Sequence, residues 1–328
     1  MTTESARTET TGSGLPLQAC ETVVYRGIAV TPLFPTRDPG CAYVSLAAAT
    51  RAGLTVTEVT ESGVVGALIV TNAAGSRVLL YDGEEVAGAK QNRILNLSVL
   101  VEAGGTLTVP VSCVEAGRWR RETDVFHPAG RVPSADVRRS KAESLHHRPT
   151  TRGLAQDAVW DAVSRSERAH GFASPTRSHG DLIEHQRPRI EDLARAFAPS
   201  PGQCGMILGM DGRITCMDAV SRPDVWADLH EAMTTGYMLD ALAAPDRAAP
   251  PEGAAAEFLG QVAAAPRTEG PGVGLGTDLR IAGPGVLGSG LALDGELLQI
   301  TAFRTGTADG GAAPIPAIRI ARPSHRQM

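Results

Sequence analysis

The sequence contains little lysine and few aromatic residues. Among its 31 basic residues only Lys90 and Lys141 are lysine, and the rest are arginine. Aromatic residues make up 4% of the 328 residues, and the 36 acidic residues give a formal charge of −5. A protein that coats nucleic acid needs a basic surface, and one that binds single strands needs stacking platforms. The composition therefore argues against bulk nucleic-acid binding.

Long hydrophobic runs and paired cysteines are also missing. No stretch approaches the roughly 18 apolar residues of a membrane span, and the first residues (MTTESARTETTGSG) lack the apolar core of a signal peptide. The five cysteines form no C-x-x-C pair, so neither a disulfide framework nor a zinc ribbon is indicated. The histidines are scattered, and we predict no metal site from them. We expect a cytoplasmic protein.

The hydrophobic pattern predicts an α+β fold with antiparallel sheet. Helix-like segments do not alternate regularly with strand-like ones, so a doubly wound parallel sheet is not expected. Asp-Gly turns recur between strand-like runs, which is typical of hairpins. We expect hairpins at Asp82-Gly83, Asp211-Gly212 and Asp294-Gly295. The strand-like runs before the middle of the chain lie at residues 21–31, 55–60, 66–72, 77–81, 94–102 and 106–114.

Composition divides the chain into five parts. We expect a disordered tail (1–19), a β-rich part with the main polar motifs (20–120), a basic connector (121–150), a helical and hairpin part (151–305) and an irregular tail (306–328). In the fourth part, helices are expected at 154–170, 178–197 and from Pro223 to about Ala243, with Ser221 as a cap. The sequence leaves open whether the two large parts form one continuous domain.

The segment from Arg118 to Arg152 is basic in an otherwise acidic protein. It holds nine basic and four acidic residues, a local excess of five positive charges. One interpretation is a solvated surface segment, and the other is a strip that binds an anion or a protein partner.

One glycine-rich motif is not interpreted as a nucleotide loop. Residues 283–288 match G-x-G-x-x-G, but a dinucleotide fingerprint must open a helix, and here a strand-like run follows. Pro284 also lacks the N–H group that a phosphate would accept from.

The most unusual polar residues lie between Tyr81 and Arg93. Glu84 and Glu85 follow a turn and can act as a general base, coordinate a hard cation such as Mg²⁺, or accept ribose hydroxyls. The alternative is a polar surface loop that satisfies its own backbone. Four ligand-binding candidates precede a hydrophobic strand and offer amide donors and acceptors with two cations: Lys90, Gln91, Asn92 and Arg93.

A second polar group follows the strand-like run 106–114. Glu115 is a candidate acid, while Arg118 and Trp119 can bind phosphate and stack on a ring; a plain ion pair and a core cap are the alternatives. Cys113 is more consistent with a buried small residue than with a nucleophile. Pairing of 94–102 with 106–114 in a hairpin would bring residues 91–93 beside 115–118 and join the two groups in one cleft.

These residues carry a family resemblance. DGEEVAGAKQNRILNLSVLV followed by VPVSCVEAGRW resembles the domain family named for its association with ADP-ribosylglycohydrolases and rhodanese-phosphatase-superfamily proteins. QDAVW at 156–160, GVGLGTDLR and LALDGELLQITAF support the resemblance, which spans about residues 20–305. Members of the family often carry histidine where this chain has Gln299.

The resemblance implies work on ADP-ribose or another NAD-derived metabolite, with hydrolase-type activity as one possibility. It implies no particular reaction. The alternative is a non-catalytic ligand-sensing or scaffold module that contacts a partner through residues 118–152. The site residues implied are Glu84, Glu85 and Glu115 as catalytic acids, and Lys90, Gln91, Asn92, Arg93, Arg118 and Trp119 as ligand-binding residues.

Overall fold

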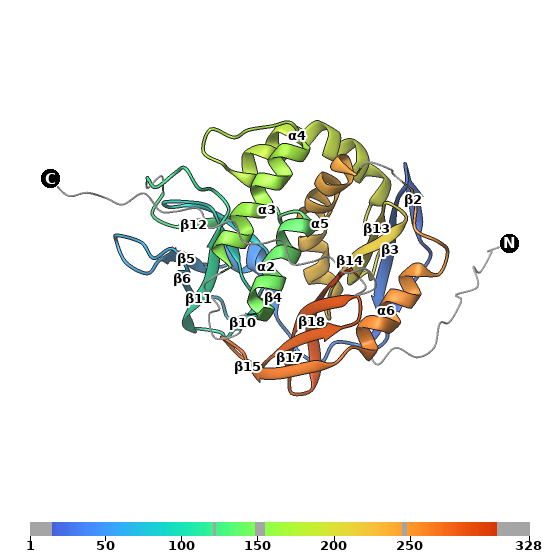
Figure 1. Ribbon diagram of the computed structural model, residues 1–328. Helices are drawn as coiled ribbons and strands as arrows, with labels where there is room; N and C mark the ends of the chain where they lie inside the picture. The colour runs from blue at the N-terminus through green and yellow to red at the C-terminus, as the bar shows by residue number, and fades with distance from the viewer. Residues whose placement is uncertain (1–14, 121–122, 148–154, 245–247, 307–328) are drawn as a thin grey trace.

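The protein has the expected α+β architecture. The computed structural model describes residues 15–120, 123–147, 155–244 and 248–306, so most of both predicted tails lies outside the described residues (Figure 1). The described residues form a nine-stranded antiparallel sheet, a closed barrel of six strands and a small three-stranded sheet, together with helices α1 to α6.

The large sheet has the strand order β1-β3-β13-β14-β18-β17-β16-β15, with β2 paired to β3. The hairpins predicted at Asp211-Gly212 and Asp294-Gly295 are confirmed, because β13 pairs with β14 and β17 with β18 around them. The glycine-rich motif at 283–288 joins β16 to β17 and opens no helix. The strands are β1 Leu17–Ala19, β2 Val23–Tyr25, β3 Ile28–Pro35, β13 Gly205–Met210, β14 Arg213–Val220, β15 Arg267–Pro271, β16 Thr277–Gly283, β17 Val286–Leu293 and β18 Glu296–Arg304.

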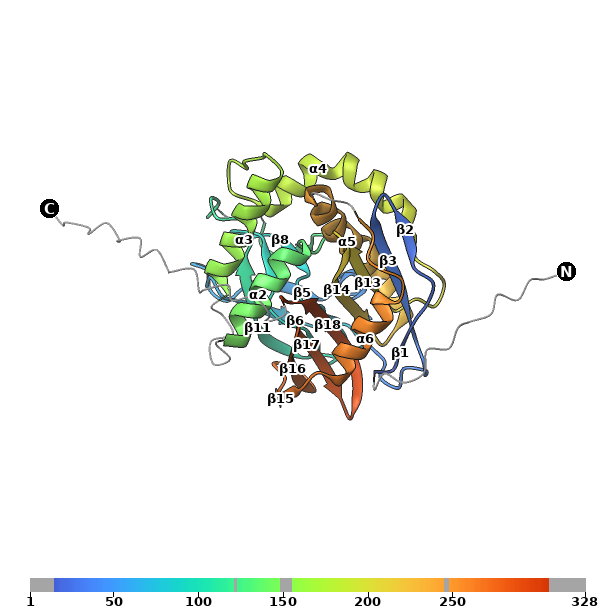
Figure 2. The ribbon, with the colours of Figure 1, turned by 45° about the vertical axis from the view of Figure 1, so that its right-hand side comes forward.

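Helices cover both faces of this sheet because side chains alternate along its strands. Met206 and Leu208 of β13 belong to the core shared with the long helix α5 (Pro223–Ala243), whereas Ile207 belongs to the core shared with α6 (Ala254–Ala264). The two helices lie on opposite sides of the sheet in Figure 2. Ser221 was expected to cap α5, but Arg222 holds the cap position, and the Ser221 hydroxyl is hydrogen-bonded to Tyr43.

In Figure 1 the six-stranded barrel lies at the left and strands β3 and β13 of the large sheet lie at the right, with helices between them. Its interior is filled by aliphatic side chains such as Val56, Val70 and Val109 together with Phe126, so it is a packed core. In barrel order the strands are β11 Thr106–Cys113, β6 Ala67–Thr71, β5 Thr55–Glu58, β12 Phe126–Pro128, β8 Glu85–Gly88 and β9 Arg93–Leu95.

Two strand predictions in this region are wrong in their pairing. The Asp82-Gly83 turn does not make a hairpin, because β7 (Val78–Leu80) pairs with β4 (Val44–Ser45) and β10 (Val99–Val101), while β8 belongs to the barrel. The run 94–102 is divided between β9 and β10, and only β9 pairs with β11. Buried polar side chains lie between the two strands: Asn96 accepts the Ser112 hydroxyl, and Ser98 accepts the Asp82 N–H.

The described helices before α5 pack beside the barrel and over the sheet (Figure 2). They are α1 Leu46–Arg51, α2 Ala135–His147, α3 Gln156–Ala169 and α4 His179–Ala194, which a short 3-10 turn, Arg195–Phe197, extends. Part of the predicted connector is therefore structured. It carries β12 and α2, and α2 buries Arg138 and Lys141 to 1% exposure, because each cation pairs with a buried carboxylate. Residues 121–122 and 148–150 of the connector lie outside the described residues.

Candidate functional site

The two predicted polar groups lie side by side at one end of the barrel. In the β9–β11 pairing Arg93 is opposite Cys113, and the Val114 N–H donates to the Asn92 carbonyl at 3.1 Å. The antiparallel register therefore continues past the end of both strands. It places residues 91–93 beside 115–118, as the sequence predicted, and we call this region the barrel end.

Arg118 ties the two groups together. Its guanidinium donates to the Glu115 carboxylate at 2.9 Å and to the Asn92 side-chain oxygen at 3.0 Å. It also donates to the Ala89 carbonyl at 3.0 Å. Because the Asn92 N–H also donates to Glu115, at 3.3 Å, the two segments are held by charge-assisted bonds on both sides. Arg118 therefore forms the ion pair with Glu115 that was the alternative interpretation, and it also holds the two segments of the barrel end together.

Arg93 is fully buried below this network. Its Nη1 donates to the Gln91 side-chain oxygen at 2.9 Å and contacts the Cys113 thiol. Its Nη2 lies 3.9 Å from a carboxylate oxygen of Glu58, whose side chain is 2% exposed. Neither Glu58 oxygen, nor Nε or Nη2 of Arg93, has a hydrogen-bond partner among the described residues. Two buried charges therefore face each other with four hydrogen-bonding atoms unused.

Sequence reasoning missed Glu58, although a signal was present. Along β5 Val56 and Glu58 are buried, whereas Thr55 and Thr57 are less so. Since side chains two apart in a strand share one face, the alternation directs this acid inward, with Val56. A charged residue at an inward-facing strand position indicates a buried polar site, and this signal could have identified Glu58.

Trp119 covers the barrel end and is 47% exposed, so it does not cap the core. The Lys90 ammonium lies 5.5 Å from its ring centre, and the Arg93 guanidinium lies 5.4 Å away, both within cation–π range. Gly63, in the loop between β5 and β6, packs against Lys90, Glu58 and Trp119 closely enough that a Cβ there would lie 3.2–3.4 Å from them. The loop therefore lies against the buried acid and the tryptophan.

The other two predicted acids have separate partners. Glu85 is held by Arg131 in a bidentate pair at 2.7 and 2.9 Å. Glu84 accepts the Tyr81 N–H at 2.8 Å, and burial, reinforced by the nearby Asp228 charge, raises its pKa to about 7. In the described part of the chain, neither carboxylate forms a hydrogen bond or ion pair with Arg93 or with the Glu115 network, so the three acids occupy distinct places.

Cys113 is confirmed as a buried residue. Its thiol is 0% exposed, and burial raises its pKa to about 11 even though Arg93 acts in the opposite direction. It is therefore a neutral thiol at physiological pH and a poor nucleophile.

Sequence reasoning also missed His179, at the start of α4. Its ring is completely buried, and both nitrogens lack hydrogen-bond partners among the described residues. Burial, with a contribution from Arg131, lowers its pKa to about 3, so it is neutral. Its backbone N–H donates to the Val114 carbonyl at 2.9 Å, which places the start of α4 directly behind the barrel end.

The comparison with known proteins agrees with the sequence motifs. The family model described as ARPP-1, the ARG and Rhodanese-Phosphatase-superfamily-associated Protein domain, matches residues 16–303. The chain belongs to the ARPP-1 family. By its description this domain is associated with ARG and rhodanese-phosphatase-superfamily proteins. No curated protein and no solved structure matches the chain.

The ARPP-1 domain holds a second buried polar cluster between α2 and the large sheet. The Asp218 carboxylate accepts both terminal nitrogens of Arg138 at 2.5 and 2.9 Å. It also accepts the hydroxyls of Tyr81 at 2.6 Å, Thr301 at 2.7 Å and Tyr237. Five donors on this one carboxylate attach α2 to β14 and β18. Sequence reasoning missed the cluster, because its members come from distant segments.

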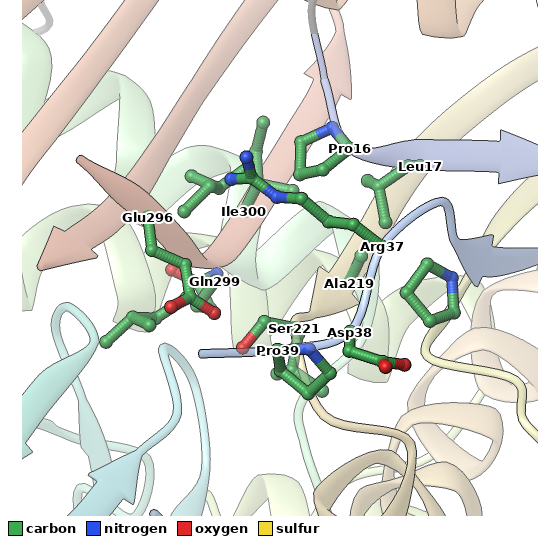
Figure 3. Close-up of a pocket in the computed structure, with 14 residues that line it drawn as sticks. Pro16, Leu17, Arg37, Asp38, Pro39, Ala219, Ser221, Glu296, Gln299 and Ile300 are labelled. Carbon is green, nitrogen blue, oxygen red and sulfur yellow. The ribbon is translucent and has the colours of Figure 1, made fainter. Parts of the chain in front are cut away.

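Beside that cluster the ARPP-1 domain has a narrow pocket at β18 (Figure 3). Gln299 lines it, the Arg37 side chain extends across it, and its remaining walls are mostly apolar. Its volume is about 20 Å³, which is room for one water molecule. The pocket is therefore too small for a metabolite in this conformation.

The described part of the ARPP-1 domain contains neither a cluster of metal-ligating side chains nor a helix that could span a membrane. Within that part, no three or more His, Cys, Asp or Glu side chains gather in a way that could hold a metal ion. None of its helices combines the length and apolar character needed to cross a membrane.

Proposed function

We propose that this protein binds an ADP-ribose-like or other NAD-derived metabolite at the barrel end. The observation that carries the proposal is the half-exposed Trp119 ring, with Lys90 and Arg93 close beside it. An exposed indole is a stacking surface for a base, and the adjacent Lys90 ammonium can attract phosphate. The family description supports the ligand class only through the proteins with which the domain is associated.

The buried pair below the tryptophan supports recognition of a group with both a donor and an acceptor. Among the described residues, the two Glu58 oxygens and two Arg93 nitrogens have no hydrogen-bond partner. A carboxamide or the edge of a purine presents an N–H next to an acceptor, so it can satisfy both residues at once. Gly63 packs on Glu58, so the ligand reaches the pair when the loop at Gly63 moves aside.

Processing of the ligand is the further part of this proposal. Glu115 is the predicted acid that lies at the barrel end, so it is the candidate for proton transfer there. Glu84 has a pKa of about 7 but lies apart from the barrel end, so it takes no direct part in this step. Glu85, already paired with Arg131, contributes by holding that arginine in place. A divalent cation such as Mg²⁺ is a candidate cofactor for any hydrolytic step, with the phosphates as its main ligands.

Calorimetric titration with ADP-ribose, NAD and phosphorylated ADP-ribose, with and without Mg²⁺, tests binding. Stacking on an aromatic ring contributes about 1–3 kcal/mol, so we expect Trp119→Ala to weaken binding by about fivefold or more. Trp119→Phe retains a ring and serves as the matched control. Absence of saturable heat with every ligand, or unchanged affinity in Trp119→Ala, would overturn the proposal.

Turnover is measured separately, by chromatography of the ligand after incubation. If the ligand is processed, Glu115→Gln should bind it but convert it much more slowly, because the amide cannot exchange a proton. Loss of binding without a change in the rate constant would instead assign Glu115 to ordering Arg118.

A second candidate, a module that docks on a protein partner, is favoured by one observation. Val64 and Val65 are 40% and 46% exposed and follow Gly63, which packs on Trp119. Exposed apolar side chains near a tryptophan and cations are typical of binding surfaces. Val65→Asp should abolish co-purification with an ARG or rhodanese-phosphatase partner and leave ADP-ribose affinity unchanged. If Val65→Asp still co-purifies with the partner but binds ADP-ribose more weakly, the metabolite site is favoured instead.

A further inference from the structure

A crevice away from the barrel end runs between helices α4 and α5. Its volume is about 420 Å³, within the range of small-molecule sites. The α4 side and the turn that follows it supply mainly apolar walls, among them Ile183, Ile190 and Phe197. All three are at most 4% exposed, so these apolar walls are themselves well buried.

The α5 side supplies two polar groups, His230 and Thr234, one helical turn apart. They are 7% and 3% exposed, and both line the crevice. The Thr234 hydroxyl has no hydrogen-bond partner among the described residues. The His230 ring meets the Trp226 indole edge-on, and no hydrogen bond from its nitrogens is found in the described part of the chain. Burial lowers the pKa of His230, so the ring is neutral and can both donate and accept.

The mouth of the crevice is charged but balanced. Arg187 on α4 is bonded to Glu184 at 2.5 and 2.7 Å, and its pKa is raised by Glu184 and, further away, by Glu191 and Glu231. The Arg195 side chain is 74% exposed, and its Nη1 lies 3.7 Å from Oδ1 of Asp192. Because each cation already has an acidic neighbour, the entrance does not select for an anion.

We propose that this crevice is a binding site for a small, neutral and mainly apolar molecule with one hydroxyl or carbonyl group. The apolar body packs against Ile183, Ile190 and Phe197, and the polar group pairs with His230 or Thr234. Hydrogen bonds buried in an apolar wall discriminate between ligands with and without the matching group. The site is independent of the barrel end, since no residue belongs to both.

Two small probes that differ by one hydroxyl test this site. 4-Fluorophenol and fluorobenzene are titrated into the full chain and followed by ¹⁹F NMR line width and shift. A net hydrogen bond of about 1 kcal/mol corresponds to about fivefold in affinity, so 4-fluorophenol should bind about fivefold more tightly. His230→Phe and Thr234→Val, singly or together, should remove this preference, whereas Thr234→Ser should keep it.

A blocking variant locates the binding. Ala194 lines the crevice at the end of α4, so Ala194→Phe should fill it and reduce binding of both probes more than tenfold. Ala264→Phe, at the exposed end of α6, is the matched control and should bind as the wild type does. No saturable binding to the wild type, or binding that survives Ala194→Phe, would overturn the site. Equal affinity for the two probes would overturn the role of His230 and Thr234.

Discussion

At the scale of single residues, the unusual feature is the incomplete pairing of Glu58 and Arg93. Arg93 reaches Glu58 only at 3.9 Å, while its nearer contacts are Gln91 and Cys113. Burial of charges with unused hydrogen-bonding atoms is unfavourable, because the lost water contacts are not replaced. The half-exposed Trp119 lies next to this pair, and the proposed recognition site is built on both features.

Removing one member of this pair should be more harmful than removing both. Arg93→Met leaves Glu58 buried without the cation that faces it, and we expect a loss of about 3–5 kcal/mol in the free energy of unfolding. Glu58→Gln in the same chain should recover part of that loss, since the neutral amide needs no counter-charge. Urea denaturation of the two variants measures both effects. If Arg93→Met alone has the same free energy of unfolding as the wild type, the buried Glu58 charge does not depend on Arg93.

At the scale of elements, strand pairs close the barrel and buried charges attach its helices. β12 pairs with only one residue of β5 but with three residues of β8, so the β8–β12 pairing is the stronger link of this short strand. Helix α2 is attached through Arg138 to Asp218 and through Lys141 to Asp82. Each attachment can be tested by one substitution.

Gly88→Ala should disturb the closure of the barrel. Gly88 has φ +124°, and a Cβ there would lie 2.5 Å from the Thr123 hydroxyl and 2.9 Å from the Val125 carbonyl oxygen. Steric overlap with backbone adds to the conformational strain, so we expect a loss of at least about 2 kcal/mol. Gly104→Ala is the control, because Gly104 also has positive φ (+72°) but open space around it. Thermal denaturation compares them, and equal losses would refute the closure argument.

Asp218→Asn should loosen the attachment of α2. The substitution leaves Arg138 buried without a full counter-charge, so the free energy of unfolding should fall by about 3 kcal/mol or more. Adding Arg138→Met should restore part of it, as measured by urea denaturation. Hydrogen exchange should localise the change to α2 and the neighbouring strands. A loss below about 1 kcal/mol would mean that the hydroxyl donors alone hold the cluster together.

At the scale of the whole molecule, two buried titratable groups act on stability in opposite directions. Glu84 keeps its proton up to a pKa of about 7 in the fold but loses it near 4.5 in the unfolded chain. Stability therefore falls as pH rises through this window. His179 has a pKa of about 3 in the fold and 6.5 when unfolded, so stability falls as pH decreases from 6.5 toward 3. Between about pH 4.5 and 6.5 the two dependences offset each other.

Substituting Glu84 or His179 should remove that residue's contribution to the pH dependence of stability and leave the contribution of the other residue. In Glu84→Gln the free energy of unfolding should rise relative to wild type by up to about 3 kcal/mol between pH 4.5 and pH 8, because the penalty for ionising Glu84 disappears. In His179→Leu the wild type's loss of stability below pH 4.5 should be reduced. Urea titrations at pH 4, 6 and 8 measure both. Parallel curves for wild type and Glu84→Gln would show that Glu84 ionises alike in both states.

Much of the fold is local in origin and was predictable. The Asp-Gly turns at 211–212 and 294–295 set hairpins because their backbone twist matches that of the strands they join. Pro223 begins α5 because its fixed φ suits the first helical turn. The hairpin predicted at Asp82-Gly83 is wrong because an Asp-Gly turn can also connect strands of two different sheets, here β7 and β8. The sequence of a turn does not show which strands pair.

The sequence by itself determined the α+β class, the family and the placement of residues 91–93 beside 115–118, since alternation, turn chemistry and two specific motifs lie within short stretches of chain. Only the tertiary structure decided which charges meet. Glu58 with Arg93, Asp218 with Arg138, and the crevice between α4 and α5 join segments separated by tens of residues. Such pairings are chosen by packing and by the need to compensate buried charge, and neither is encoded in local spacing.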